Sequence, residues 1–386
     1  MATIIANRKR LISAINAASK ATASKRCPKP ILRSCKLSVN GHVTFSATDI
    51  EVESAIDVDC EHHGDAELLF DPKALLARLR MSKAKECKVV VDPRDKWMSV
   101  DESEASECVA TDNANEHPYM LNGSYKPKYG IIVDAADVKQ RIGYVADCVD
   151  TDCTRYALGG ILVEIHSDGI MLVATDGRRL AWSPISDAIC GAKPEASGVM
   201  PASTIKALIA MLGEVSRVAV SMDEVSILFE GIDESDNIVA RVWSRLVEGR
   251  FPAWVDVVEG CLADTPICVK VNGCELANAA KIAKNANRAA GKEYSGMRLQ
   301  FHDAGKVVWV ADGNESCRGK IDLRTDCECD GLKVMLDASF VESAALKQRK
   351  GDVRLLIKDS DSAVVIHQPD WSEVIMPINV NKKPRK

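Results

Sequence analysis

No stretch of the 386-residue sequence stays apolar for the roughly 20 residues that a membrane-spanning helix needs. The first 20 residues carry spaced rather than continuous apolar side chains, so we expect no secretory signal. The 14 cysteines are scattered, and neither Cys148 with Cys153 nor Cys327 with Cys329 has the paired CxxC spacing of a zinc site. We therefore expect a cytoplasmic protein with reduced thiols, no metal and no cofactor.

Catalytic arrangements are also missing. No Ser/His/Asp or Cys/His pattern is legible, and a nuclease or polymerase would need clustered carboxylates to hold metal ions. Asp49, Asp176 and Asp312 recur, but one follows each of three similar strands, so the fold disperses them and a structural role in a turn is favoured. A sequence-specific DNA-binding regulator would need a recognition helix, and none stands out. We therefore expect no active site.

Acidic residues are absent from the first 48 positions, which contain nine Lys and Arg. Residues 49–70 show the reverse, with eight acids and no Lys or Arg. The overall charge is −5, which argues mildly against nucleic acid. However, the basic residues accompany helix-like segments, so a fold that gathers its helices on one side would present a basic face to a polyanion. The alternative is that these charges are merely solvated surface.

One short segment occurs three times in the sequence. Ser46–Asp49 is repeated as Val173–Asp176 and, without the threonine, as Val310–Asp312. An amphipathic helix pattern, a strand and a glycine-containing turn precede each copy. The apolar positions of the three helix patterns are Leu11, Ile12 and Ile15, then Val138, Ile142 and Val145, and finally Leu276 and Ile282.

Each repeat continues with an apolar strand, a capped helix and a two-stranded hairpin. In the first repeat Asp71-Pro72 supplies a helix start, because Asp is a good N-cap and Pro fits the first helical position. The sequence thus predicts an α+β fold of three repeated domains, each built from two helix-plus-sheet halves. We expect the domains at 1–127, 128–258 and 259–386.

Several longer motifs support a family assignment. They are Ala174–Ala181, Glu248–Pro252 with Trp254, Pro30–Leu32, Arg155–Leu158 and Val374–Ile378. With them the chain resembles the bacterial sliding clamp, the beta subunit of DNA polymerase III, over essentially its whole length.

The resemblance implies a head-to-tail homodimer whose six domains of the DNA-clamp type form a closed ring around double-stranded DNA. Helices would line the hole and sheets would form the outer wall. Such a ring tethers the replicative DNA polymerase for processivity during DNA replication, and the clamp loader and repair proteins bind it through a short linear motif. The alternative is a DNA-binding scaffold or regulator without ring closure.

The resemblance also places two candidate sites. The first is a hydrophobic cleft for the partner motif between the second and third domains. Its matching positions are Leu158, Thr175, Gly177, Arg178, Arg179, Leu180, Pro252, Val257, Val374, Ile375, Met376, Pro377 and Ile378. The second is a set of DNA contacts on or beside the lining helices. These are Lys20, Lys25, Arg26, Tyr156, Lys281, Lys284 and Arg288.

Two departures from the family pattern stand out. Asp256 occupies a position near the cleft where relatives often carry a basic residue. The chain also extends past the last strand with a basic tail, residues 381–386, for which we expect disorder or contact with DNA or partners.

Overall fold

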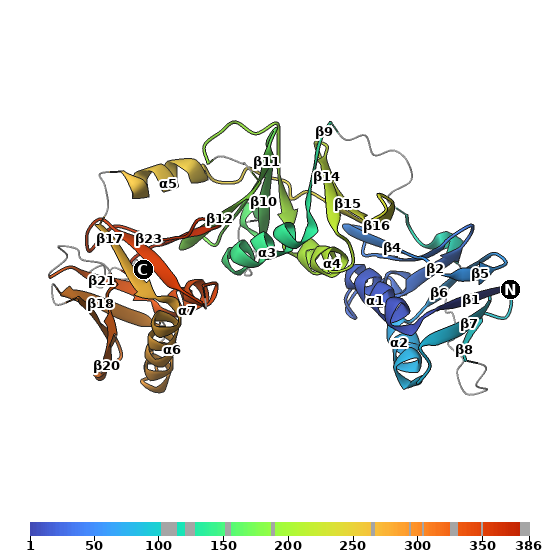
Figure 1. The fold of residues 1–386 in the computed structure, drawn as a ribbon, viewed down its shortest axis with the longest axis horizontal. Coiled ribbons are helices and arrows are strands. Elements are labelled where there is room, and N and C mark those ends of the chain that lie inside the picture. Colours follow the sequence, from blue (N-terminus) through green and yellow to red (C-terminus); the bar gives the residue numbers. More distant parts are fainter. Residues whose placement is uncertain are drawn as a thin grey trace.

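The protein forms an arc in which helices line the concave side and sheets form the convex side (Figure 1). The computed structural model describes residues 1–101, 114–119, 128–150, 156–186, 190–263, 267–292, 295–302, 305–324, 331–348 and 350–378. Several parts of the sequence prediction lie outside these residues. They are the tail at 381–386, the first domain boundary at residue 127, and Cys153, Cys327 and Cys329. None of the described helices is long and apolar enough to cross a bilayer.

In the described part of the chain, six α-helices repeat the same unit and a seventh differs from them. The six concave helices are α1 (Arg8–Ala18), α2 (Pro72–Met81), α3 (Ala135–Val145), α4 (Ala202–Leu212), α6 (Gly273–Ala289) and α7 (Ala338–Leu346). The seventh, α5 (Trp254–Leu262), lies on the convex side (Figure 1). The sequence analysis did not predict α5, and the expected boundary between residues 258 and 259 falls inside it. The domain boundaries stay predictions.

Most of the concave helices start at an Asp or Asn that also ends a strand. The side chain of Asp71 accepts a hydrogen bond from the Lys73 backbone N–H at 2.9 Å, and Asp337 does the same for Ser339. Asn7, Asp134 and Asn272 cap α1, α3 and α6 in the same way. The helix start predicted at Asp71-Pro72 is therefore confirmed, and the capping side chains explain why five of the six strands turn directly into a helix. The exception is α4, which follows Pro201 and has no side-chain cap.

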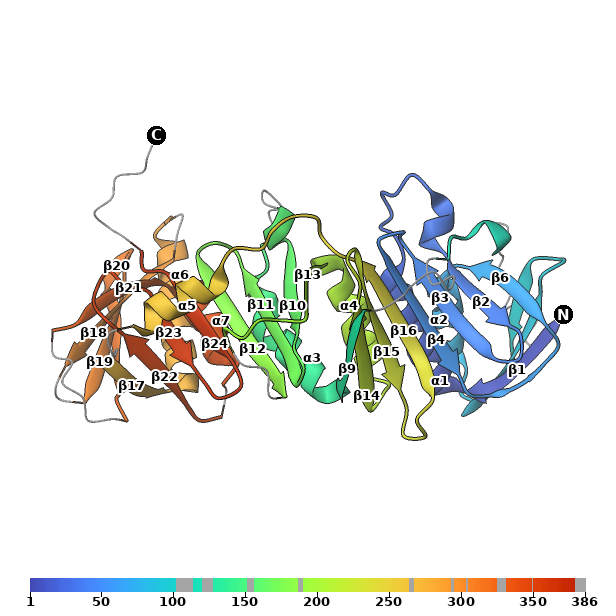
Figure 2. The ribbon, with the colours of Figure 1, turned by 90° about the horizontal axis from the view of Figure 1, so that it is seen from above.

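Four antiparallel sheets follow one another along the long axis (Figure 2). The first eight-stranded sheet has the order β6 (Ala66–Phe70), β2 (Cys35–Val39), β3 (Val43–Thr48), β4 (Val52–Val58), β16 (Ile238–Arg245), β15 (Ser226–Ile232), β14 (Arg217–Met222), β9 (Tyr129–Asp134). The second has the order β13 (Ala196–Pro201), β10 (Gly160–Ile165), β11 (Gly169–Thr175), β12 (Arg179–Ser186), β24 (Ser372–Ile375), β23 (Val364–His367), β22 (Asp352–Ile357), β17 (Ile267–Asn272).

Two four-stranded sheets close the ends of the arc. At the N-terminal end the order is β5 (Glu61–His63), β1 (Ala2–Asn7), β7 (Glu86–Asp92), β8 (Trp97–Val100). At the other end it is β20 (Asn314–Asp322), β19 (Lys306–Ala311), β18 (Gly296–His302), β21 (Lys333–Asp337). Each eight-stranded sheet joins strands from two repeats, through the pairs β4–β16 and β12–β24.

The strands on either side of the three glycine-containing turns agree with the prediction, but several strands were missed. The sequence analysis did not identify β4, β12 and β20, which follow the turns at Asp49, Asp176 and Asp312. It also did not identify β1, β9 and β17, which precede helices. The clearest case is β20, whose residues are nearly all polar and exposed, so it lacks the alternation that marks a half-buried strand. Ile282 was also assigned to the apolar positions of its helix, yet it is 49% exposed, because α6 packs through Leu276 and small alanines.

Candidate functional site

The outer face of the second eight-stranded sheet carries an apolar cluster of its own. It is separate from the cores that lie between the sheets and the concave helices. Leu158, Leu180 and Val374 belong to it and are buried, and Trp254 and Val258 of α5 pack on them from outside. Leu180 of β12 lies opposite Val374 of β24, so the cluster crosses from the second repeat to the third.

An exposed rim surrounds this buried floor. Met376 is 49% exposed and Val257 is 40% exposed, which is unusual for large apolar side chains, and Pro252 and Gly177 are also at the surface. The backbone N–H of Met376 donates to the carbonyl of Arg178 at 3.0 Å, which fixes the end of β24 beside the turn after β11. The structure therefore brings Leu158, Leu180, Pro252, Val257, Val374 and Met376 to one junction. Two predicted cleft residues differ, because Ile375 is buried in the core on the concave side and the Ile378 N–H donates to the Met335 carbonyl of the end sheet. We call this surface, with Leu180 and Val374 buried beneath it and Val257 and Met376 exposed at its edge, the outer groove, after the cleft that the resemblance implies.

The turn that borders the outer groove is fixed by its own side chains. The hydroxyl of Thr175 donates to the Arg179 carbonyl at 2.7 Å and accepts from the Gly177 N–H at 3.1 Å. Asp176 accepts from the backbone N–H groups of Arg178 and Arg179. Gly177 has a φ of +82°, a conformation that glycine adopts without steric cost. Thr48 and Asp49 make the equivalent bonds in the first repeat, so the expected structural role is confirmed for Asp49 and Asp176. Asp312 differs, because its carboxylate forms an ion pair with Lys292 at 3.6 Å.

The repeats provide an internal comparison for the outer groove. In the first sheet Glu53 pairs with Thr48 across the strands, as Leu180 pairs with Thr175 in the second. By the same alignment Ser46 of the first sheet corresponds to Val173 of the second. The equivalent junction between the first and second repeats therefore has polar residues at two positions that are apolar in the second sheet, although Trp243 lies opposite Glu53 there.

Two arginines connect the outer groove to α7. Arg178 and Arg179 both lie over the ring of Phe340, with guanidinium carbons 5.1 and 4.5 Å from its centre. Arg178, whose side chain is 61% exposed, also reaches the helix-capping carboxylate of Asp337 at 3.4 Å. Cation–π contacts of this kind hold a guanidinium at a defined place while leaving its edge available.

Beneath these arginines lies a buried group of charges. Arg179 contacts Asp176 at 3.1 Å and Glu373 at 3.6 Å, and Lys347 of α7 contacts the same Glu373 at 2.6 Å. The side chains of Glu373 and Lys347 are almost completely buried, so removing either partner would leave an uncompensated charge. The network therefore locks β12 of the second repeat to β24 and α7 of the third, and it gives the groove a rigid base.

Sequence profiles give the family of the chain. The profile of the DNA polymerase III beta subunit N-terminal domain matches residues 2–121, and that of the central domain matches residues 132–253. Together the two cover more than half of the chain. The chain belongs to the DNA polymerase III beta subunit family.

Individual relatives extend the match to the third repeat. The beta sliding clamp of Pseudomonas aeruginosa is 21% identical over 365 residues, which span 92% of this chain and 94% of the relative. The beta sliding clamp of Vibrio cholerae is 23% identical over 367 residues, spanning 93% and 95%. The crystal structure of the DNA polymerase III beta subunit from Thermotoga maritima matches with a TM-score of 0.82 at 19% identity, covering 98% of this chain and 100% of that one. The fold is that of these clamps.

Most of the predicted DNA-contact residues of this beta subunit are exposed. Lys20, Lys25 and Arg26, just after α1, are exposed, as are Lys281 and Arg288 of α6. Lys284 differs, because it is half-buried and forms an ion pair with Glu342 of α7, which reduces its charge toward a ligand. The side chain of Tyr156 lies outside the described part of the structure.

Four further cations of the concave helices were not among the DNA contacts predicted from the sequence, although basic residues were associated with helix-like segments. They are Lys73 and Arg80 of α2, Lys139 of α3 and Lys206 of α4, and all four are exposed. Each of these helices packs its apolar side on a sheet, so its exposed side faces the concavity. Helical spacing was the signal in the sequence that could have identified them. It places these cations on the polar side of each helix, and that side faces the concavity in this fold.

Proposed function

We propose that this beta subunit is a DNA sliding clamp, which closes into a ring as a head-to-tail homodimer, encircles double-stranded DNA and tethers the replicative polymerase. It acts in the cytoplasm as a processivity factor and needs no active site of its own. The observation that carries this proposal is the arrangement of the sheets. Two complete sheets of eight strands lie within the chain, and half of a sheet stands at each end.

The end sheets support closure by a second copy. Inside the chain, the last strand of one half-sheet pairs with a strand from the neighbouring repeat, as β4 pairs with β16 and β12 with β24. In the third repeat β20 holds the position of β4 and β12, and it is an edge strand in the described part of the chain. An edge strand offers unpaired N–H and C=O groups to another chain. A second copy that pairs its N-terminal end sheet with β20 would complete the sheet at both junctions.

Charge favours the same pairing. β20 exposes two cations, Arg318 and Lys320, and two acids, Glu315 and Asp322. The two acids form ion pairs with Arg298 and Lys306 of their own sheet, which leaves the two cations as the charges available at the edge. The sequence from 101 to 116, which follows β8, contains the acids Asp101, Glu102, Glu104, Glu107, Asp112 and Glu116. Opposite charges at an interface guide the correct encounter and oppose the pairing of like ends. The edges are therefore suited to a head-to-tail contact.

The outer groove is proposed as the docking site for the short linear motif of the polymerase, the clamp loader and repair proteins. Apolar walls, an adaptable methionine and a few fixed polar groups are what a peptide groove needs. The exposed Met376 and Val257 supply the apolar rim, and the fixed Arg178 supplies a polar group that can set the register of a bound peptide.

Loading on DNA tests the ring directly. Clamp loaded onto nicked circular DNA should elute with the DNA from gel filtration in high salt, because escape requires the opening of a protein interface. After a restriction enzyme cuts the circle, the protein should elute alone, since it slides off the ends. Equal retention on both forms would contradict the ring and indicate a DNA-binding scaffold without ring closure.

A further inference from the structure

A cavity of about 630 Å³ lies beneath residues 245–255, the segment that crosses the outer face of the second sheet from β16 to α5. We call this segment the strap. The cavity has an apolar floor at Leu162 and Val199 and an apolar wall at Phe251 and Trp254. Its volume is within the roughly 300–1,000 Å³ of typical ligand pockets.

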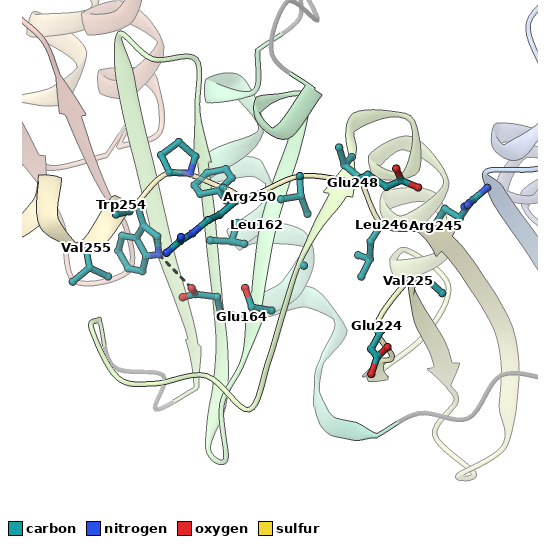
Figure 3. Close-up of a pocket in the computed structure, with 18 residues that line it drawn as sticks. Leu162, Glu164, Glu224, Val225, Arg245, Leu246, Glu248, Arg250, Trp254 and Val255 are labelled. Atoms are coloured by element: carbon teal, nitrogen blue, oxygen red, sulfur yellow. Dashed lines mark hydrogen bonds between the residues drawn. The ribbon is translucent and has the colours of Figure 1, made fainter.

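Both ends of the strap are attached to the body, so the cavity is a built feature. At one end the backbone N–H of Val247 donates to the Val199 carbonyl at 2.8 Å, and Gly198 leaves room for Leu246. At the other end the indole N–H of Trp254 donates to Glu164 Oε1 at 3.4 Å (Figure 3). The conspicuous motif Glu248–Pro252 thus forms the part of the strap that spans the cavity, whereas the outer groove uses only its Pro252.

Glu164 is the chemically distinctive group in this cavity. Its side chain is only 13% exposed, and burial raises the pKa of its carboxyl. The ring of His166 lies 4.0 Å from the other carboxylate oxygen, but burial lowers the pKa of that imidazole, so it is neutral near pH 7. Among the described residues no Lys or Arg forms an ion pair with Glu164, although Arg250 extends from the strap toward the same region (Figure 3). A buried carboxylate with one weak neutral donor attracts a cation.

The cavity and the outer groove are adjacent. Leu162 of β10 lies opposite Val173 of β11, which lies opposite Trp182 of β12, two residues along that strand from Leu180. The two floors are therefore about 12 Å apart at the usual strand spacing and rise per residue. About four residues of extended peptide, at roughly 3.3 Å each, cover that distance. Pro252 is one of the groove positions and also lines the cavity, so the two sites share a wall.

We propose that the cavity under the strap is a second anchor pocket for partner peptides, which takes an aliphatic side chain followed by an arginine or lysine that pairs with Glu164. This inference rests on the proposed role of the outer groove. We infer an aliphatic side chain from the apolar floor of the cavity. We infer that it belongs to the peptide bound in the outer groove because the two sites share a wall at Pro252. A partner with this extension would bind more tightly than one with the groove motif alone.

Peptide titrations by fluorescence anisotropy test the pocket. The probes are a polymerase clamp-binding motif peptide, and the same peptide extended on either side by a Gly-Ser spacer and Leu-Arg, Leu-Glu or Gly-Gly. One Leu-Arg extension should bind about tenfold more tightly than the motif alone, and the Leu-Glu and Gly-Gly extensions should not. Glu164→Gln should remove this gain and leave the affinity of the motif peptide unchanged. Glu259→Gln, which removes an exposed carboxylate of α5 that does not line the cavity, should keep the gain.

A second variant covers the case in which Glu164→Gln disturbs the strap. Val225 is 63% exposed at the cavity mouth, so Val225→Trp fills the mouth from the surface and should also remove the gain. A motif peptide that binds without any gain from Leu-Arg, or a gain that persists in both variants, would overturn the second pocket alone. A motif peptide that does not bind at all would overturn the proposed outer groove, and the second pocket with it.

Discussion

Single residues decide how the outer groove is bordered, and the repeats allow them to be compared. The turn after β3 and the turn after β11 have the same hydrogen bonds, yet Ile50 occupies the position of Gly177 and has a φ of +85°. A β-branched residue in that conformation is strained, because its Cβ crowds the backbone. The protein therefore contains the same turn in a relaxed and in a strained form.

We expect Ile50→Gly to stabilise the protein by about 1 kcal/mol, since it removes the strain at a half-exposed position. The reverse change, Gly177→Ile, should destabilise it by about 1–2 kcal/mol. Thermal unfolding of the two variants beside the parent measures both effects. The two variants form a matched pair, because they make opposite substitutions at equivalent positions of two turns with the same hydrogen bonds. A lower Tm for Ile50→Gly would contradict the proposed strain at Ile50.

The groove itself is tested by the double variant Leu180→Ala with Met376→Ala. Each truncation should weaken the binding of a clamp-binding peptide by about 2 kcal/mol, because apolar anchors in such a groove contribute most of the affinity. Calorimetric titration measures the loss, and thermal unfolding verifies that the fold survives. Ile282→Ala is the control, since Ile282 is as exposed as Met376 but lies on the concave helix α6. An unchanged affinity in the double variant would refute the groove.

At the scale of elements, much of the fold could be predicted because local chemistry marks it. Asp71-Pro72 marks a helix start, and the apolar spacing of Val138, Ile142 and Val145 marks the buried side of α3. The strand β20 could not be predicted, because an edge strand with polar exposed residues resembles a loop. The groove residues were located through the family motifs, but the cavity under the strap was not, since it forms between segments such as Gly198 and Phe251 that carry no joint pattern in the sequence.

The helix caps of α2 and α7 offer a test at this scale. Asp71→Ala should cost about 1 kcal/mol through the lost hydrogen bond to the Lys73 N–H. Asp337→Ala should cost more, because Asp337 caps α7 in the same way and also pairs with Arg178. Chemical denaturation compares the two variants. When Asp337→Ala is made in a protein that already carries Arg178→Ala, its cost in unfolding free energy should fall to that of Asp71→Ala. If the cost of Asp337→Ala is the same with and without Arg178, the ion pair does not contribute.

At the scale of the whole molecule, one edge strand and one basic face carry the proposed ring. The parent protein should have the mass of a dimer by light scattering at micromolar concentration. Arg318→Glu with Lys320→Glu should shift it toward the monomer, because the reversed edge would then face the acidic sequence after β8 with like charge. Lys73→Glu with Arg80→Glu, the same change of charge on the concave helix α2, should leave the dimer mass unchanged. A monomeric parent would refute the ring.

The concave face has a separate signature in salt. Binding of short linear duplex should be weak and fall steeply with salt, because it depends on phosphate contacts and counterion release. Changing Lys20, Lys25 and Arg26 to Glu should make the salt dependence weaker. The negative slope of log affinity against log salt should become shallower by up to about 3, at about 0.9 per lost phosphate contact. Lys193→Glu, an exposed cation outside the lining helices, should leave the slope unchanged. Fluorescence anisotropy at several salt concentrations measures the slope, and an equal effect of both variants would exclude a specific concave face.

The pairing of β4 with β16 has a consequence for biosynthesis. β4 ends at Val58, and its partner β16 begins at Ile238, so a ribosome must add 180 residues before the two can meet. At about 5–20 residues per second, β4 waits roughly 10–40 seconds with one edge bare, while β3, β2 and β6 on its other side are already able to pair. The same wait recurs between β12 and β24, which are separated by most of the second half of the chain. The nascent chain is therefore a natural client for chaperones that bind exposed strand edges, and its yield in the cell should depend on the pace of translation as much as on the stability of the finished arc.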